Sequence, residues 1–160
     1  MRIRVAFYKA RGSWWNSIVR WWTRSEYSHA ELVMPDEITW ISISPFLSSR
    51  VESREKKEYD EKVWDFIDFF ISEKEYHEIE DFYEETKGSK YDWVGMIVSQ
   101  FLPSGLKLTN VRKWYCSEWI AHALRAADVI PWKKFKLYEK KDISPGTLYK
   151  IVSECVDNDL

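Results

Sequence analysis

The sequence predicts an α+β fold in which a small antiparallel sheet packs against helices, within one domain spanning residues 1–160. Three observations support this prediction. Apolar and polar residues alternate in the N-terminal half, as they do in half-buried strands, while later segments repeat apolar residues at helical spacing. No linker, internal repeat or low-complexity tract divides the chain. At 160 residues, 45% of them hydrophobic, the chain is large enough to bury a substantial core.

The predicted strands combine β-branched and aromatic residues with polar ones in alternation. They are residues 2–9, 27–34, 38–44 and 63–70. The second and third strands flank a short polar turn and therefore predict a β-hairpin. The segment from Pro45 to Glu61 is polar and charged, and it predicts a loop.

The predicted helices occupy the region after Arg11-Gly12 and most of the C-terminal half. They are residues 13–24, 72–86, 91–101, 114–127 and a short final helix after 144–146. The first would carry Trp14, Trp15, Trp21 and Trp22 on one broad face. The acidic second helix has Ser72 as its N-cap and ends near Gly88. The clearest helix is 114–127, which is rich in Ala and apolar residues.

Composition excludes several classes of protein. The formal net charge is -2, and the basic stretch from Lys133 to Lys141 is interrupted by other residue types, so a nucleic-acid partner is not expected. The two cysteines form neither a disulfide framework nor a zinc motif, and no metal or cofactor is expected. No signal peptide or membrane span is evident, so we expect a cytoplasmic protein in which a free thiol is the default.

Cys116 is the candidate nucleophile because it lies at or just before the start of the helix 114–127. Unpaired backbone N–H groups and the positive end of the helix dipole favour a thiolate there, and the same groups can stabilise an oxyanion. The alternative is a structural cysteine at the head of a buried helix stripe. That stripe comprises Cys116, Ile120, Ala123 and Ala127. Cys155, near a charged C-terminus, has no expected role.

A thiol nucleophile needs a base, and the chain has three histidines. His77 lies within the acidic helix and is expected at the surface. His122 lies six residues after Cys116, about 240° around the same helix, so it cannot face the thiol. His29 begins a strand, and alternation places Glu31 on the same strand face. His29 is therefore the candidate base, with a purely structural histidine as the alternative.

The group that orients the imidazole is left open by the sequence. Glu31 shares a strand face with His29, whereas Ser42 and Ser44 lie on the partner strand of the hairpin. With a two-residue turn, His29 would fall roughly opposite Ser42. Glu31, Ser42 and Ser44 are thus all candidates.

Four motifs, in this order, resemble a known family. They are Ser28-His29-Ala30-Glu31-Leu32-Val33, Gly88-Ser89-Lys90-Tyr91-Asp92-Trp93, Trp114-Tyr115-Cys116-Ser117-Glu118 and Ile143-Ser144-Pro145-Gly146-Thr147-Leu148. Together they resemble the circularly permuted NlpC-type papain-like proteins, the YiiX/YaeF-like group, in which the histidine precedes the cysteine helix. The His-x-Glu form of the first motif is similar to that of small uncharacterised proteins encoded by tailed bacteriophages.

This resemblance implies a circularly permuted papain-like fold with Cys116 as nucleophile and His29 as base. It implies a thiol-dependent hydrolase that cleaves an amide or isopeptide bond, with a peptidoglycan stem peptide as the usual case. The family pattern places a glutamate on the strand after the histidine, where this chain has serines, so Glu31 is the replacement candidate. Tyr115 and Tyr91 are expected to shape the site.

Two other functions stay open. One is a lipid or thioester acyl hydrolase or acyltransferase, for which the tryptophan-rich helix at residues 13–24 would lie on a membrane surface. The other is a catalytically idle phage module that binds a host protein in the host cytoplasm through an aromatic surface. A thiol with ordinary reactivity would favour the idle module.

Overall fold

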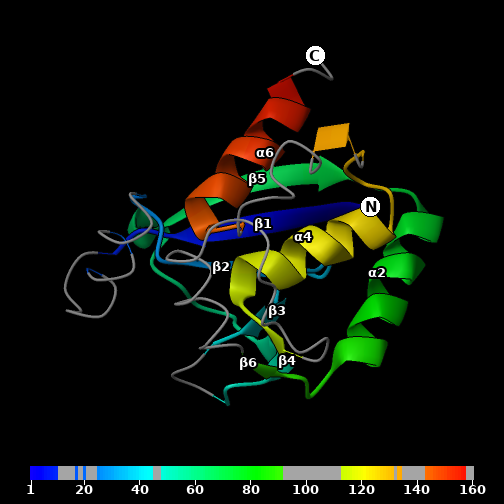
Figure 1. Ribbon diagram of the computed structural model, residues 1–160, viewed down its shortest axis with the longest axis horizontal. Coiled ribbons are helices and arrows are strands. Elements are labelled where there is room, and N and C mark those ends of the chain that lie inside the picture. Colours follow the sequence, from blue (N-terminus) through cyan, green and yellow to red (C-terminus); the bar gives the residue numbers. More distant parts are fainter. Residues whose placement is uncertain are drawn as a thin grey trace, which may run out of the picture.

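The computed structural model of the protein has an α+β architecture (Figure 1). It describes residues 1–10, 17, 20, 25–44, 48–91, 113–131, 133–134 and 143–157. Within these residues, a five-stranded antiparallel sheet packs against three α-helices. The α+β class and the small antiparallel sheet packed on helices are therefore confirmed.

The sheet has the strand order β4-β3-β2-β1-β5. Its strands are β1 (Arg2–Tyr8), β2 (His29–Val33), β3 (Thr39–Ile43), β4 (Val51–Glu55) and β5 (Trp64–Phe70), the last preceded by the 3₁₀ turn η1 (Glu61–Val63). A second, two-stranded parallel sheet joins β6 (Lys90–Tyr91) to β7 (Lys113–Trp114). The strand β7 ends one residue before Tyr115, so this small sheet leads directly into the helix that begins at Cys116.

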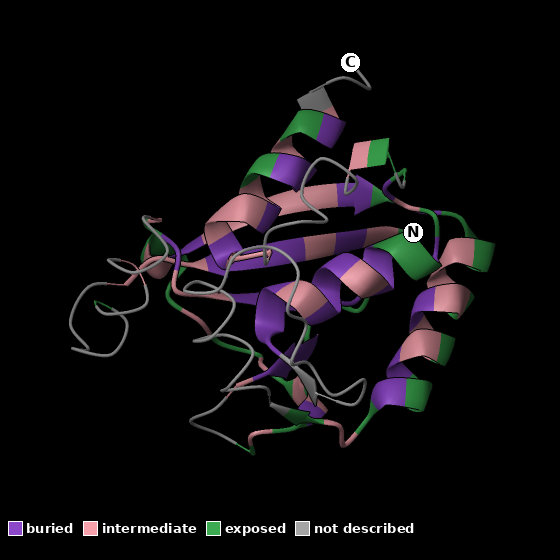
Figure 2. Cartoon of the chain, viewed as in Figure 1, coloured by how far each residue is buried: buried purple, intermediate pink, exposed green. Residues whose placement is uncertain are grey.

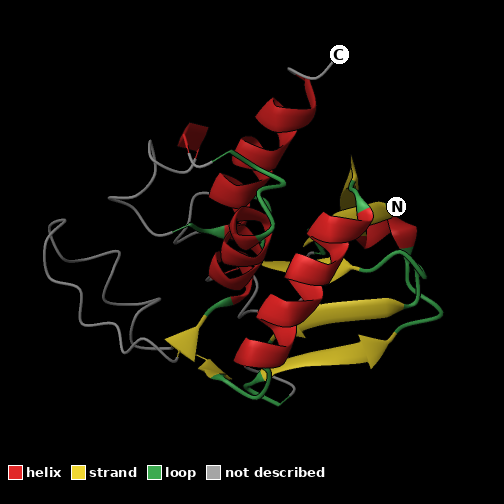
Figure 3. Ribbon diagram, turned by 90° about the vertical axis from the view of Figure 1, so that its right-hand side faces the viewer, coloured by secondary structure: helices red, strands yellow, loops and turns green. Residues whose placement is uncertain are grey.

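Three helices complete the described fold: α2 (Glu73–Thr86), α4 (Cys116–Ala126) and α6 (Pro145–Asp157). In Figure 1, α4 and α6 lie in front of the strands, and the side view in Figure 3 has them on one side of the sheet. Figure 2 shows that α2 turns its buried side inward, toward α4 and the sheet. None of the described helices is both long enough and apolar enough to cross a membrane.

Strand alternation gives the sheet two different faces. The face under the helices carries the main core, to which the strands contribute Ile3, Val5, Phe7, Ala30, Leu32, Ile41, Ile43, Val51 and Phe69. The opposite face carries a smaller cluster, which comprises Ala6, Val33, Trp40 and Trp64 with Tyr8, Tyr59, Val63 and Phe66 packed around them. We call this smaller set the aromatic cluster. Because alternate residues point to opposite faces, His29 and Glu31 belong to the face of Val33 and the aromatic cluster.

Most predicted elements are confirmed. The strands at 2–9 and 63–70 and the hairpin appear as β1, β5 and the antiparallel pair β2–β3. In α2 the capping box forms as expected: the Ser72 hydroxyl accepts from the Glu75 N–H at 3.2 Å, and the Glu75 carboxylate accepts from the Ser72 N–H at 2.6 Å. After α2, Gly88 takes a φ of 78°, a conformation that favours glycine.

Two predictions were wrong. The loop predicted at 45–61 contains β4, an edge strand in which Val51 is fully buried while charged residues alternate with it. Tyr91, predicted to begin a helix, is extended in β6 and pairs with Trp114. Long-range pairing overrode local preference in both cases, because an edge strand needs few apolar residues once a neighbour supplies its hydrogen bonds.

Several predictions lie outside the described residues. They concern the helix at 13–24, apart from Ser17 and Arg20, the part of the predicted helix 91–101 that follows Tyr91, and most of the basic stretch 133–141. The final helix is present as α6, and it begins at Pro145, with the Ser144 hydroxyl accepting from the Thr147 N–H at 3.2 Å.

Candidate active site

Cys116 is the first residue of α4 and is buried, with 5% of its surface exposed. The preceding Tyr115 is the N-cap residue and has an extended backbone. The unpaired N–H groups of the first turn of α4 therefore lie at the end of the helix that carries the thiol. The backbone N–H groups of Ser117 and Ala30 hydrogen-bond to the sulfur and lower the pKa of Cys116, which burial alone would raise. A helix terminus and a strand therefore both stabilise a thiolate at this position.

His29 is the first residue of β2, opposite Tyr8 of β1. The described pairing of β2 with β3 consists of Leu32 with Ile41 and Val33 with Trp40, so it ends before the segment that contains His29. At this end of β2 the strand instead meets α4, since the Ala30 N–H donates to the sulfur of Cys116. The local opening of the hairpin lets the helix N-terminus reach the histidine.

The Cys116 thiol group and the His29 imidazole are hydrogen-bonded to each other. Burial alone would lower the pKa of His29, but the charge and hydrogen bond of the Cys116 thiolate, with a contribution from Glu31, raise it to about 10. Burial opposes ionisation of Cys116 too, but the His29 imidazolium brings the pKa of the thiol below its ordinary 9.0. The two groups titrate as a pair, and each favours the charged form of the other.

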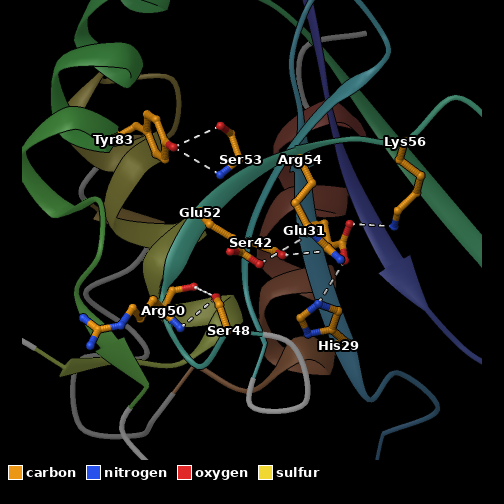
Figure 4. A network of polar contacts seen from close by, with 10 residues as sticks. All are labelled: His29, Glu31, Ser42, Ser48, Arg50, Glu52, Ser53, Arg54, Lys56 and Tyr83. Carbon is orange, nitrogen blue, oxygen red and sulfur yellow. Dashed lines mark hydrogen bonds and ion pairs between the residues drawn. The ribbon is translucent and has the colours of Figure 1, made fainter.

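Glu31 completes the cluster from the same strand (Figure 4). His29 Nε2 donates to Glu31 Oε1 at 3.2 Å, which leaves Nδ1 as the ring nitrogen for the thiolate. The Glu31 side chain is only 3% exposed. Burial alone would raise its pKa, but His29 and Lys56 lower it to about 2. A buried carboxylate thus stays ionised against the imidazolium at neutral pH.

Two cations from the edge of the sheet neutralise Glu31. Arg54 Nη2 donates to Glu31 Oε1 at 2.9 Å, and Lys56 Nζ donates to Glu31 Oε2 at 2.8 Å. Sequence reasoning missed both because it treated the segment from Pro45 to Glu61 as a loop. The available signal was the alternation of Val51 and Ser53 with charged residues, which places Arg54 on the same face as Glu31.

The hairpin serines occupy other positions than expected. Leu32 pairs with Ile41, so Ser42 falls level with Glu31, and the prediction that it lies opposite His29 was wrong. The reason is the turn, which spans more than two residues because Met34 N–H already bonds to the Thr39 carbonyl. Ser42 is 2% exposed and accepts from Arg54 Nη2 at 3.3 Å, so it contacts the cation that holds Glu31.

The remaining candidates are placed as follows. Ser44 follows β3, and its carbonyl accepts from the Ser49 N–H at 3.0 Å. Tyr115 is buried at the N-cap of α4, directly before the thiol, whereas Tyr91 belongs to the parallel pair β6–β7. Ser117 is buried, and its hydroxyl donates to the Ile143 carbonyl, which gives it a structural contact.

The other histidines and the second cysteine lie elsewhere. His77 is exposed on α2, as the sequence predicted, and it contacts Glu80. His122 is half-buried on α4, six residues after Cys116. Cys155 is buried in α6 and, like Cys116, is a free cysteine. The predicted helix stripe is also confirmed, because Ile120, Ala123 and Ala127 are buried in the main core below Cys116.

Replacement of Glu31 by Gln is expected to lower stability at neutral pH by about 3 kcal/mol, since it leaves Arg54, Lys56 and the imidazole of His29 facing an uncharged buried group. The folded pKa of Glu31, about 2, lies below its ordinary 4.5. The carboxylate therefore stabilises the fold fully above about pH 4.5, and this contribution is lost as pH falls toward 2. Urea unfolding at about pH 7 and about pH 3 measures the difference between the two proteins, which should shrink at the lower pH.

Glu52→Gln is the matched control for this experiment. Glu52 lies on β4, partly exposed, with its carboxylate 4.0 Å from Arg54 Nε. A long and partly solvated contact contributes little, so this variant should change stability by less than about 1 kcal/mol at either pH. Equal losses in the two variants would contradict the role of Glu31 as a buried ion.

Among the described residues, no group of three or more His, Cys, Asp or Glu side chains is arranged to hold a metal ion. Comparison of the chain with protein-family models, with curated proteins and with solved structures finds no match. The function is therefore argued from the geometry of Cys116, His29 and Glu31.

Proposed function

We propose that this protein is a thiol-dependent hydrolase with a circularly permuted papain-like fold that cleaves an amide or isopeptide bond. Cys116 is the nucleophile, His29 the acid–base group and Glu31 the group that orients the imidazole. The observation that carries the proposal is that one imidazole hydrogen-bonds both to the thiol group of Cys116 and to the buried carboxylate of Glu31. This is the arrangement that activates a thiol nucleophile and fixes its base.

The architecture supports the permuted papain-like assignment. A histidine at the start of a strand precedes, along the chain, a cysteine at the N-terminus of a helix. That helix packs on the strand that carries the histidine, and Ala30, Leu32, Ile120 and Ala123 all belong to the main core. The four motifs that resemble the YiiX/YaeF-like group include both of these elements.

In the proposed reaction the Cys116 thiolate attacks the carbonyl carbon, and the carbonyl π electrons move to oxygen. In this proposal the Cys116 backbone N–H, at the start of α4, donates to this oxyanion. Collapse of the tetrahedral intermediate breaks the C–N bond, and the amine leaves with a proton from His29. The product of this half-reaction is a thioester on Cys116 with a neutral imidazole.

Hydrolysis of the thioester reverses the roles. Neutral His29 takes a proton from water as the oxygen of that water attacks the thioester carbonyl. The C–S bond then breaks, which releases the carboxylic acid and restores the thiolate and the imidazolium. Glu31, ionised through the whole cycle because its pKa is about 2, stabilises the imidazolium in the resting state and in both proton transfers.

The proposed substrates are amides and isopeptides, in which a nitrogen atom carries the acyl group. A stem peptide of the cell wall is the leading example. The same attack cleaves lipid esters and thioesters, so a substrate panel contains peptide amides, isopeptides and acyl thioesters. A peptide or isopeptide is expected to be turned over best. Preference for long-chain acyl thioesters would support the acyl hydrolase instead.

The first test is the pH dependence of Cys116 alkylation by iodoacetamide in a Cys155→Ala background. Cys116 should react at pH values well below its ordinary pKa of 9.0, since its thiolate is paired with His29. The rate should stay level through neutral pH and rise again near pH 10, where His29 loses its proton and the sulfur becomes a free thiolate. A single titration at the ordinary thiol pKa, or no reaction, would support the idle binding module.

A further inference from the structure

Lys56 occupies a defined position beside the site described above. It directly follows β4, and its backbone N–H donates to the Ile38 carbonyl at 2.8 Å, so the main chain is tied to the turn before β3. Its side chain is 21% exposed, and its ammonium group donates to Glu31 Oε2 at 2.8 Å. Figure 4 shows the side chain reaching Glu31 from the side opposite His29.

Two rings of the aromatic cluster hold the ammonium group of Lys56. The nitrogen lies 4.0 Å from the ring centroid of Trp40 and 4.5 Å from that of Trp64. Trp40 is fully buried and Trp64 is 8% exposed, and their rings meet edge to face at 5.3 Å. Cation–π attraction to two buried rings restricts the side chain far more than an exposed ion pair would. The position of the Lys56 side chain is thus set by the aromatic cluster.

The two oxygens of Glu31 have different partners. Oε1 accepts from both His29 Nε2 and Arg54 Nη2, whereas Oε2 accepts from Lys56. Arg54 also contacts the Ser42 hydroxyl at 3.3 Å. With Oε2 anchored, the carboxylate cannot rotate about its terminal bond without losing the Lys56 contact. The anchor keeps Oε1 directed at the histidine.

We infer that Lys56 is a positioning residue: it anchors one oxygen of Glu31 so that the other holds the His29 ring toward the thiol. This inference rests on the proposed function, and it adds a group that does not touch the reacting atoms. The aromatic cluster then has a role beyond packing, since it fixes the cation that fixes the carboxylate. The charged groups that face Glu31 are His29 from β2, Arg54 from β4 and Lys56 itself.

The test compares Lys56→Met with the wild type in the Cys155→Ala background. Methionine keeps the apolar stem on the two rings and removes the charge. The readouts are the pKa of the His29 ring, followed by NMR, and the rate of Cys116 alkylation at about pH 6. Loss of positioning should lower the His29 pKa by about one unit and slow alkylation about tenfold, because fewer thiolate–imidazolium pairs remain.

The direction of the His29 shift separates positioning from simple loss of a nearby charge. Removal of a cation acting only through space would raise the pKa of His29, since the remaining carboxylate then attracts the proton more strongly. Loss of the Glu31 contact lowers it. An unchanged or raised His29 pKa in Lys56→Met would therefore overturn the inference.

Three further variants complete the experiment. Lys57→Met is the matched control, because Lys57 is 72% exposed and pairs with Glu55, which is 69% exposed, so both readouts should match the wild type. Lys56→Arg should restore both readouts, since a guanidinium also stacks on tryptophan and pairs with carboxylates. Lys56→Gln provides a second neutral side chain and should shift the His29 pKa downward, as methionine does.

Failure of this inference is distinguishable from failure of the proposed function. If wild-type Cys116 is activated but Lys56→Met matches it in both readouts, only the role of Lys56 is wrong. If the wild-type thiol itself titrates at its ordinary pKa, both proposals are wrong.

Discussion

Turnover of a peptide or isopeptide substrate is expected to fall by about 10⁴-fold or more when Cys116 is replaced by Ala, because the thioester can no longer form. Cys116 lies at the end of the α4 stripe, with its side chain buried above Ile120. Alanine keeps the helix start and removes only the sulfur, so the fold should be retained. Steady-state kinetics with circular dichroism of the same samples measures both effects.

Cys155→Ala is the control for this prediction. Cys155 is also buried in the main core, but it lies on α6, where a free cysteine behaves as a small apolar side chain. Its replacement should cost some stability and leave kcat unchanged. Undiminished turnover in Cys116→Ala, or a comparable loss in both variants, would remove Cys116 from the role of nucleophile.

Replacement of His29 by Ala is expected to slow alkylation of Cys116 at neutral pH by about 100-fold. Among the groups that lower the pKa of this thiol against burial, the His29 imidazolium has the largest effect. Without the imidazolium, burial dominates and the pKa of the thiol rises above its ordinary value. The rate at pH 7 then follows a small thiolate fraction, and the level region between neutral pH and about pH 10 disappears.

His77→Ala provides the comparison for His29→Ala. His77 is exposed on α2 and contacts Glu80 on the same helix. Its loss should leave the alkylation profile of Cys116 unchanged. A His29→Ala protein with the wild-type profile would mean that the helix N-terminus alone activates the thiol, and the assignment of the base would have to be abandoned.

The elements that could be predicted from sequence are those with a strong local signal. The capping box of α2 satisfies its own N–H groups within four residues, so it forms wherever the helix lies. In the same way, the apolar stripe of α4 predicted a helix, and the structure begins that helix at Cys116. The hairpin β2–β3 also follows from two strand-forming runs around a short turn.

The elements that could not be predicted depend on pairing over long distances. Strand β4 has one fully buried apolar residue, Val51, and its hydrogen bonds come from β3, so the local sequence resembles a loop. The register of the hairpin depends on the length of its turn. Because the predicted turn was too short, Ser42 was predicted to lie opposite His29, whereas in the structure it lies level with Glu31. With β4 missing, the two cations around Glu31 were missed as well.

The sequence by itself determined that a thiol starts a helix and that His29 and Glu31 share a strand face, because helix ends and strand alternation are local properties. The tertiary structure decided that this histidine meets this thiol, since α4 packs on β2 where the hairpin opens. It also decided that Glu31 is a buried ion rather than a surface carboxylate. Arg54 and Lys56, which neutralise it, lie 23 and 25 residues further along the chain, and only sheet pairing brings them to it.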